Sequence, residues 1–412
     1  MKDWKASLVR YFAEGAKETG EARLGVEVEH FILDGARRTA IPYAGENGVR
    51  EILTRLMARY PGAGVKVLPD DDFFGFAVPE FTITLEPAAQ LEISIAPMGS
   101  VRRIGEVYRD FSENLDAVLA EFGYAAVNAG CQPVSRVAEL ALIPKRRYDL
   151  MNAHFEQYGT GGMEMMRGTA SLQVSIDYRS ETDFRKKIQA AYYYAPILKL
   201  LCDNSPSFQG APLNTRLKRT DIWRRVDPVR CGILPGVFSA SYGFADYAAF
   251  LGDLPLIFLK RGGQVVPTGS RTVAELFGGK TLSEDEITHI LSMAFPDMRL
   301  KQYLEIRVAD SVSPPFLLAY AALIKGLLYS EDGLDYAQEQ IFERSGARLS
   351  EDDVRRAEDA LMEQGWNAPV YGRPAGELAD QILALARRGL PEDEKVFLNA
   401  WETVNTHVGG ES

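Results

Sequence analysis

Apolar and polar side chains alternate along residues 24–33 of the chain, LGVEVEHFIL. A period of two residues is typical of a β-strand, so this pattern predicts a strand with two different faces. One face carries mainly apolar side chains, those of Val26, Val28, His30 and Ile32. The other carries Glu27 and Glu29, which lie about 7 Å apart at the rise of a strand. Unpaired buried carboxylates repel each other and are costly to desolvate, so this face either meets water at a sheet edge or binds a divalent cation.

Strands with one polar face are also predicted in three further stretches, 83–97, 171–178 and 301–310. Their polar side chains are those of Glu86, Glu92, Gln173, Ser175, Asp177, Glu305 and Arg307. Four such strands predict a curved sheet whose concave side holds hard cations beside a phosphate. Carboxylate oxygens suit Mg²⁺ or Mn²⁺, and an arginine among them suits an anion. His30 points to the opposite face, which indicates a packed residue rather than a ligand.

Apolar residues at helical spacing predict helices over 2–19, 49–60, 101–122, 181–203, 316–329, 333–345, 350–364, 374–388 and 393–406. Asp3 and Ser350 are the expected N-caps of two of them. The run Tyr192-Tyr193-Tyr194 fits either a core or a subunit interface. The C-terminal hundred residues hold no polar cluster comparable with that of the strands, so we expect them to be structural.

The composition of the chain excludes several classes of protein and of binding site. The chain has 412 residues, 46% of them hydrophobic, and a net charge of -11 without a long basic run, which argues against a nucleic-acid partner. No signal peptide or membrane-spanning run is apparent, so we expect a cytoplasmic protein. The three cysteines are too few and too scattered for a disulfide framework or a zinc site, and we expect free thiols at Cys131, Cys202 and Cys231.

Two segments are rich in basic residues. Residues 133–151 are predicted to form a long loop whose basic side chains are either solvated or close over a bound anion; these are Lys145, Arg146 and Arg147. Residues 216–235 hold five arginines, Arg216, Arg219, Arg224, Arg225 and Arg230. They are either solvated on a surface helix or clamp a carboxylate with paired N–H donors. The acidic triplet at 70–72 fits a solvated turn or the rim of a site.

Several motifs occur in a fixed order: GVEVEHF, LEPAAQLEISIAP, MMRGTASLQVSIDY, DNSP with RTDIWRRVDPVRCGILP, and FPDMRLKQYLEIRVAD. With them, the chain from about residue 20 to 330 resembles the glutamate–cysteine ligase family of the plant and proteobacterial type. The resemblance implies an α+β fold like that of glutamine synthetase, an antiparallel sheet forming a cup with helices on its outer face. It also implies a catalytic domain over 1–330 and a helical extension over 331–412.

The resemblance further implies an ATP-dependent ligase. ATP would phosphorylate the γ-carboxylate of L-glutamate, and the α-amine of L-cysteine would then displace phosphate to give γ-glutamylcysteine. Charge in such a transfer is stabilised by Mg²⁺, with Mn²⁺ possible, and by cationic side chains. The metal positions would be Glu27, Glu29, Glu92 and Glu305. Gln173 would stand beside one ion, Arg307 would contact the γ-phosphate, and Arg219 and Arg230 would hold substrate carboxylate or phosphate. We expect Glu305, Arg307 and Arg230 to matter most for catalysis.

The sequence also departs from the plant pattern. Ala88 and Ala89 stand where two glycines are usual, Arg167 and Gly168 replace a Leu-Arg pair, and 311–315 lack the usual aromatic and basic residues. These changes leave two alternatives open besides cysteine ligation. The acceptor could be another amine or amino acid in a specialised pathway, or the chain could be a non-catalytic relative that binds nucleotide or glutamate. We expect a monomer or a homodimer.

Overall fold

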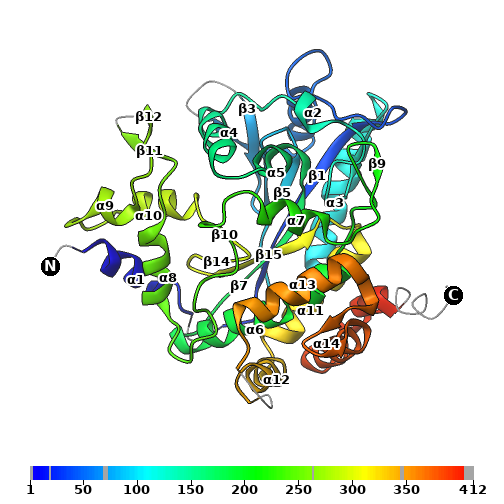
Figure 1. Ribbon diagram of the computed structural model, residues 1–412. Helices are drawn as coiled ribbons and strands as arrows, with labels where there is room; N and C mark the ends of the chain where they lie inside the picture. The colour runs from blue at the N-terminus through cyan, green and yellow to red at the C-terminus, as the bar shows by residue number, and fades with distance from the viewer. Residues whose placement is uncertain (1–2, 18–19, 68–72, 262–263, 344–347, 403–412) are drawn as a thin grey trace.

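A single large antiparallel sheet organises the molecule (Figure 1). The computed structural model describes residues 3–17, 20–67, 73–261, 264–343 and 348–402. Its nine strands run in the order β14 (Met298–Leu300), β15 (Leu304–Asp310), β7 (Ser171–Ile176), β1 (Leu24–Asp34), β5 (Leu91–Met98), β4 (Phe81–Leu85), β3 (Phe73–Ala77) and β2 (Gly64–Val67), with β6 (Tyr124–Val127) paired to the end of β1. The expected α+β fold with a large antiparallel sheet is confirmed.

Three long helices cover the apolar face of this sheet. They are α3 (Val101–Ala120) on β5 and β6, α11 (Pro314–Leu328) on β1 and β7, and α6 (Glu181–Leu201) on β14 and β15. Val26 and Val28 of β1 are fully buried there, as predicted from the alternation. His30 is also packed: its Nδ1 lies 3.1 Å from the carbonyl oxygen of Leu91 and its Nε2 lies 2.7 Å from the hydroxyl of Tyr108 on α3. Burial lowers the pKa of His30 to about 4.

The C-terminal helices pack on α6 and α11. They are α12 (Glu331–Phe342), α13 (Glu351–Gln364) and α14 (Ala375–Gly389), followed by the 3₁₀ helix η3 (Lys395–Trp401). Ser350 caps α13 and Asp3 caps α1 (Trp4–Glu14), as expected. The predicted helix over 393–406 is wrong in type, since residues 395–401 form a 3₁₀ helix, and residues 403–406 lie outside the described part.

Short elements lie over the opposite, polar face. They include α4 (Arg146–Tyr158), α5 (Gly162–Gly168), α7 (Lys218–Arg224) and α10 (Glu284–Leu291). The remaining elements are α2 (Val49–Ala58), η1 (Val137–Glu139), β8 (Ser207–Phe208), β9 (Ala211–Pro212), β10 (Cys231–Gly232), α8 (Phe244–Asp253), β11 (Phe258–Arg261), β12 (Gln264–Pro267), α9 (Val273–Phe277), β13 (Phe295–Pro296), η2 (Gly365–Asn367), β16 (Pro369–Val370) and β17 (Arg373–Pro374).

Two sequence-based interpretations are resolved by this packing. The prediction of a long loop over 133–151 is wrong, because η1 lies within it and α4 begins at Arg146. The tyrosine run 192–194 lies in the middle of α6 and all three side chains are at most 2% exposed, so it belongs to the core. The three cysteines are free thiols, as expected. The acidic triplet 70–72 lies outside the described residues.

Candidate active site

Strand register brings the predicted polar side chains into two rows. Glu27 on β1 pairs with Gln173 on β7 and with Ser94 on β5. One step further along β1, Glu29 pairs with Glu92 on β5. Directly opposite residues in an antiparallel pair lie about 5 Å apart, so the carboxylates of β1 and β5 share one small area. The structure thus brings Glu27, Glu29 and Glu92 together, as the alternation predicts.

Burial, and then the charge of neighbouring carboxylates, raises the pKa values of Glu27, Glu29 and Glu92. Burial raises the pKa of Glu29 to about 7, with Glu86 adding to the effect, and burial with the nearby Glu27 carboxylate raises that of Glu92 well above its usual range. Burial, followed by the charge of Glu305, also raises the pKa of Glu27. Hydroxyl and amide donors offset only part of this cost: Ser171 donates to Glu29 through its backbone N–H (2.7 Å) and its hydroxyl (2.9 Å). The cluster therefore has the properties of a site for added positive charge.

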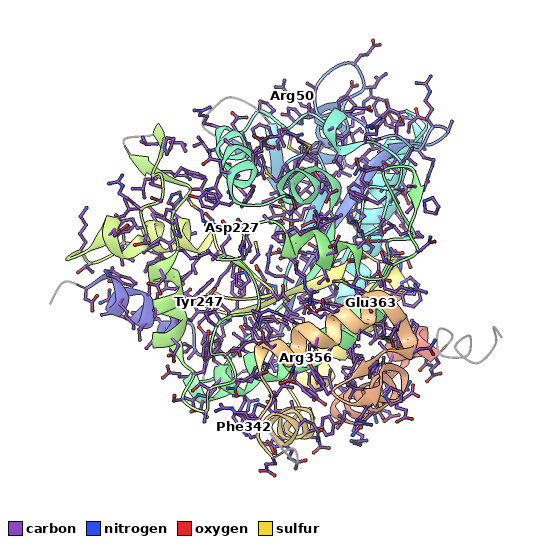
Figure 2. All side chains as sticks on the ribbon, in the orientation of Figure 1. Arg50, Asp227, Tyr247, Phe342, Arg356 and Glu363 are labelled. Carbon is purple, nitrogen blue, oxygen red and sulfur yellow. The ribbon has the colours of Figure 1, made fainter. Side chains whose placement is uncertain are left out.

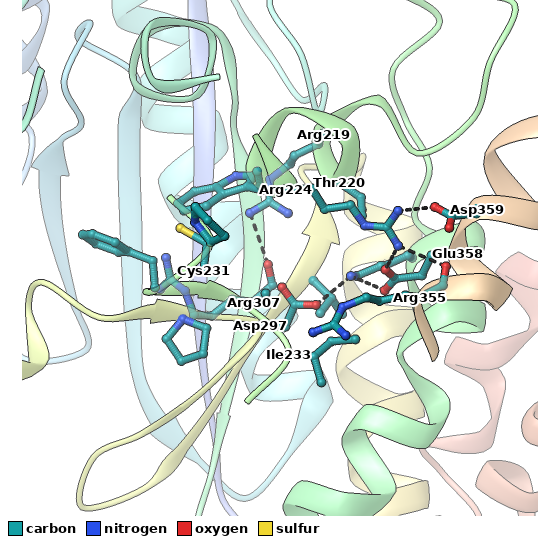
Figure 3. Close-up of a pocket in the computed structure, with 17 residues that line it drawn as sticks. Arg219, Thr220, Arg224, Cys231, Ile233, Asp297, Arg307, Arg355, Glu358 and Asp359 are labelled. Carbon is teal, nitrogen blue, oxygen red and sulfur yellow. Dashed lines mark hydrogen bonds and ion pairs between the residues drawn. The ribbon is translucent and has the colours of Figure 1, made fainter. Parts of the chain in front are cut away.

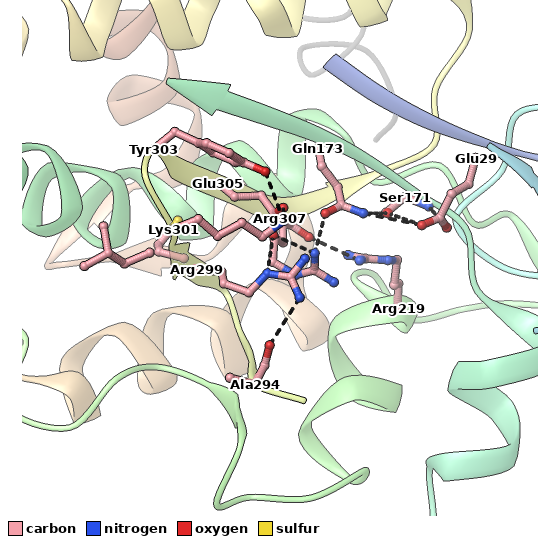
Figure 4. A network of polar contacts seen from close by, with 12 residues as sticks. Glu29, Ser171, Gln173, Arg219, Ala294, Arg299, Lys301, Tyr303, Glu305 and Arg307 are labelled. Atoms are coloured by element: carbon pink, nitrogen blue, oxygen red, sulfur yellow. Dashed lines mark hydrogen bonds and ion pairs between the residues drawn. The ribbon is translucent and has the colours of Figure 1, made fainter. Parts of the chain in front are cut away.

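A cationic cluster occupies the neighbouring strands (Figure 4). Glu305 on β15 is fully buried, and its two carboxylate oxygens accept hydrogen bonds from Arg299 (2.7 Å), Lys301 (2.8 Å) and Arg307 (2.8 Å). Although burial opposes ionisation, these three cations lower the pKa of Glu305 well below its usual range. Arg307 also donates to the amide oxygen of Gln173, which joins the cations to the carboxylate rows.

A β-bulge sets the position of Arg307. Ile306 pairs with Val174 of β7, but the next pair is Ala309 with Leu172, so β15 contains one residue more than its partner. The backbone of Arg307 finds other partners: its N–H donates to the carbonyl of Asp297 (3.0 Å), and its carbonyl accepts from the Nη2 of Arg219 (3.1 Å). The backbone N–H and C=O of Arg307 are therefore both held from outside β7.

One cavity of about 420 Å³ joins the two clusters. Its lining includes the four carboxylates Glu27, Glu29, Glu86 and Glu92, the cations Arg147, Arg219, Arg299, Lys301 and Arg307, and apolar side chains of α4, α5 and α10. Within the residues that the structure describes, the buried Nε atoms of Arg147 and Arg219 and the indole nitrogen of Trp223 have no hydrogen-bond partner. A second cavity of about 290 Å³ lies behind Arg219 and Arg307 and reaches α13 (Figure 3).

The structure does not bring Arg230 to this cavity. Its guanidinium, 1% exposed, donates to Asp227 (2.6 Å) and to the carbonyls of Met293 (3.0 Å) and Pro255 (2.8 Å), and it also contacts His154. Asp227 is not among the residues that line either cavity, and Figure 2 places it close to where Figure 1 labels β10. These bonds tie β10 to neighbouring loops and favour a structural role for Arg230, while its expected role in holding a substrate stays a prediction. Arg224 and Arg225 are likewise paired with acidic side chains.

Sequence reasoning misses Arg299 and Lys301 as parts of the site. They stand two positions apart before Glu305, a spacing typical of one face of a hairpin partner strand. Arg147, one of the three basic residues expected in a loop that is solvated or closes over an anion, lines the cavity from the first turn of α4. No local pattern in the sequence indicates that α13 reaches the cavity of about 290 Å³ behind Arg219 and Arg307.

The donor set of the acidic cluster suits a divalent cation. Four carboxylates around one cavity, three of them with raised pKa values, supply the oxygen ligands that Mg²⁺ and Mn²⁺ prefer. In the part of the chain that the structure describes, no three acidic, His or Cys side chains already lie close enough together to form a ready metal site. Glu305 fits that role less well, because both of its oxygens accept bonds from cations.

Residues 23–410 match the profile of glutamate–cysteine ligase family 2. The chain belongs to this family. It is 30% identical to the chloroplastic glutamate–cysteine ligase of Arabidopsis thaliana over 97% of this chain and 77% of the relative, and 30% identical to that of Medicago truncatula over 98% and 80%. The resemblance stated from the motifs is confirmed.

A solved structure shares the fold. The glutamate–cysteine ligase of Francisella tularensis, determined in complex with AMP, superposes with a TM-score of 0.57 at 12% identity and covers 96% of this chain and 84% of its own. Within the described residues, no helix is long and apolar enough to cross a membrane.

Proposed function

We propose that this glutamate–cysteine ligase family member joins the γ-carboxylate of L-glutamate to the α-amine of L-cysteine at the expense of ATP. The observation that carries the proposal is one cavity in which a cluster of carboxylates faces a cluster of cations. Phosphoryl transfer needs both: hard-cation ligands for the nucleotide phosphates and cationic groups for charge on the transferred phosphoryl. The family assignment and the relatives' names support the same reaction.

In the first step, an oxygen of the glutamate γ-carboxylate attacks the γ-phosphorus of ATP, the bond to the β-phosphate oxygen breaks, and ADP leaves. Arg307 and Lys301 stand where negative charge on the phosphoryl oxygens would be stabilised. Glu305 holds both of them through charge-assisted hydrogen bonds, so they need little reorganisation during the reaction. We therefore assign Glu305 the role of an anchor for these cations rather than that of a metal ligand.

In the second step, the amine of cysteine attacks the carbonyl carbon of γ-glutamyl phosphate, loses a proton, and expels phosphate. Arg147 and Arg219 line the cavity, and their guanidinium groups are suited to hold substrate carboxylates. Apolar side chains of α4, α5 and α10, those of Met151, Met165, Met166 and Leu291, line the cavity and suit the thiol side chain of the acceptor.

Metal binding is assigned to Glu27, Glu29 and Glu92, with Glu86 at the cavity wall and Gln173 beside them. A bound Mg²⁺ or Mn²⁺ would supply neutralisation of the phosphate oxygens. The chain's own contribution is to place these carboxylates on adjacent strands, where their mutual repulsion favours cation binding.

A second candidate keeps glutamate activation but uses another amine as acceptor. It is favoured by Ala88 and Ala89, because this turn borders the cavity at Pro87 and Gln90 and departs from the family's usual glycines. A non-catalytic role is less well supported, since the site keeps both of its charged clusters. The cytoplasmic location, the monomer or homodimer, and the division at residue 330 stay predictions.

The test is phosphate release from ATP with L-glutamate and a panel of amines, cysteine first, with the product identified by mass. Release with cysteine and the mass of γ-glutamylcysteine supports the proposal. Glutamate-dependent release with only another amine favours the second candidate. No release with any amine rejects both and leaves the binding role.

A further inference from the structure

A buried ion network connects the C-terminal helix α13 to the site (Figure 3). Glu358 of α13 is 2% exposed and accepts hydrogen bonds from Lys199 of α6 and from Arg224 of α7. Lys199, 5% exposed, also contacts Asp297 at 2.7 Å. Four charged groups from four separate segments are therefore linked, and all four line the cavity of about 290 Å³.

Such a network is not explained by stability alone. Desolvating several charges costs as much as their attraction returns, so a buried ion pair is weak evidence for a stabilising role. What a buried network does fix is the relative position of the segments that it joins. Here these segments are α13, α6, α7 and the link between β13 and β14.

Two routes lead from Glu358 to the backbone of Arg307. Through Lys199 it holds Asp297, whose carbonyl accepts the N–H of Arg307 (3.0 Å). Through Arg224 it holds α7, which also carries Arg219, and Arg219 donates to the carbonyl of Arg307 (3.1 Å). Neither contact comes from β7, whose pairing with β15 shifts register between Ile306 and Ala309.

We infer that Glu358 is a positioning residue for Arg307 and Arg219, and that α13 thereby completes the active site from the C-terminal region. Glu358 touches no substrate in this account; it acts through the two arginines. The inference deepens the proposed function and rests on it for its kinetic readout.

The first test compares Glu358→Gln with Asp359→Asn as a matched control. Asp359 follows directly on α13 and pairs with the same Arg224, but its side chain is 60% exposed. Glu358→Gln is expected to lower kcat about tenfold with the KM values for ATP and L-glutamate within about twofold, because misplacing a transition-state donor affects the chemical step. Asp359→Asn is expected to stay within about twofold of the parent. Equal kcat values for Glu358→Gln and the parent would overturn the inference.

A double-mutant cycle separates positioning from general destabilisation. If Glu358 acts through Arg307, then Glu358→Gln in an Arg307→Lys background should lower kcat less than about twofold further. A further loss of about tenfold there would indicate an independent structural effect and reject the inference. Glu358→Asp, which keeps the charge, takes the place of Glu358→Gln in the same cycle if the latter does not fold.

A readout without turnover keeps this inference apart from the proposed function. Amide hydrogen exchange in a peptide covering 304–310 should be faster in Glu358→Gln than in the parent, because the hydrogen bonds of the Arg307 backbone N–H and C=O are loosened. It should be unchanged in Asp359→Asn. Unchanged exchange in Glu358→Gln would reject the inference even if the parent is an active ligase. Faster exchange supports it even if the parent turns over none of the amines tested.

Discussion

The two halves of the site are built in opposite ways. On β1 and β5 the carboxylates of Glu29 and Glu92 lie on directly paired residues, and their pKa values are raised. On β14 and β15 every cation contacts the one carboxylate of Glu305, whose pKa is lowered. In the first half the buried carboxylates raise the cost of ionisation, whereas in the second half three cations already offset it. A single sheet face thus carries a carboxylate-rich part suited to cations beside a cation-rich part suited to an anion.

The largest effect is expected from metal removal, which addresses the acidic half. Treatment with EDTA followed by dialysis should abolish glutamate-dependent phosphate release, and Mg²⁺ or Mn²⁺ should restore it, because four carboxylates would otherwise face the nucleotide phosphates. Full activity in the metal-free protein would remove the metal assignment and with it the proposed difference between the halves.

The next largest effect is expected in the cationic half of the site, on the turnover number of an Arg307 variant. Arg307→Ala should lower kcat by roughly 10²- to 10³-fold, about 2.7–4 kcal/mol, as for other losses of a donor to developing charge. Arg356→Ala, at an exposed arginine of α13 that pairs with Asp353, serves as the control. A turnover number unchanged in Arg307→Ala would exclude this side chain from the mechanism.

The apolar face of β1 gives a reference without catalytic function. The pKa of His30 is lowered to about 4 in the folded protein, below its usual value near 6.5, so this residue stabilises the fold above pH 6.5 and loses that contribution as the pH falls toward 4. Between pH 7 and 5 the free energy of unfolding should drop by roughly 2 kcal/mol more in the parent than in His30→Gln. Denaturant unfolding at both pH values measures this, and parallel pH profiles would refute the burial argument.

The smallest effect concerns the turn beside the acidic cluster. Ala89 has a φ of 66°, in the left-handed region that favours glycine. Ala89→Gly should raise the free energy of unfolding by roughly 0.5 kcal/mol, because relief of the strain of about 1–2 kcal/mol exceeds the added entropy of the unfolded chain. Thermal unfolding with Ala88→Gly as the companion variant tests it; a lower stability of Ala89→Gly would mean that the turn is not strained.

Local alternation was enough to predict the polar strands and the grouping of Glu27, Glu29 and Glu92, because the period of a strand fixes which side chains share a face. It does not predict α4, whose apolar positions are few. The motif position of Arg230 likewise says nothing about Asp227 and His154, which contact its guanidinium. The contact of Glu358 with Lys199 spans 159 positions, and no local pattern carries such information.

The bulge in β15 has a consequence for anyone who would transplant this site. It adds one residue between Ile306 and Ala309, so the odd-numbered Glu305 and the even-numbered Asp310 pair with Ser175 and Ser171, two residues that lie on the same face of β7. Beyond the bulge, even-numbered residues of β15 therefore occupy the sheet face that odd-numbered residues occupy before it. A designed sheet that copied the side chains but kept strict alternation would turn everything after Val308 to the wrong face. A design must therefore reproduce the bulge as well as the charged side chains.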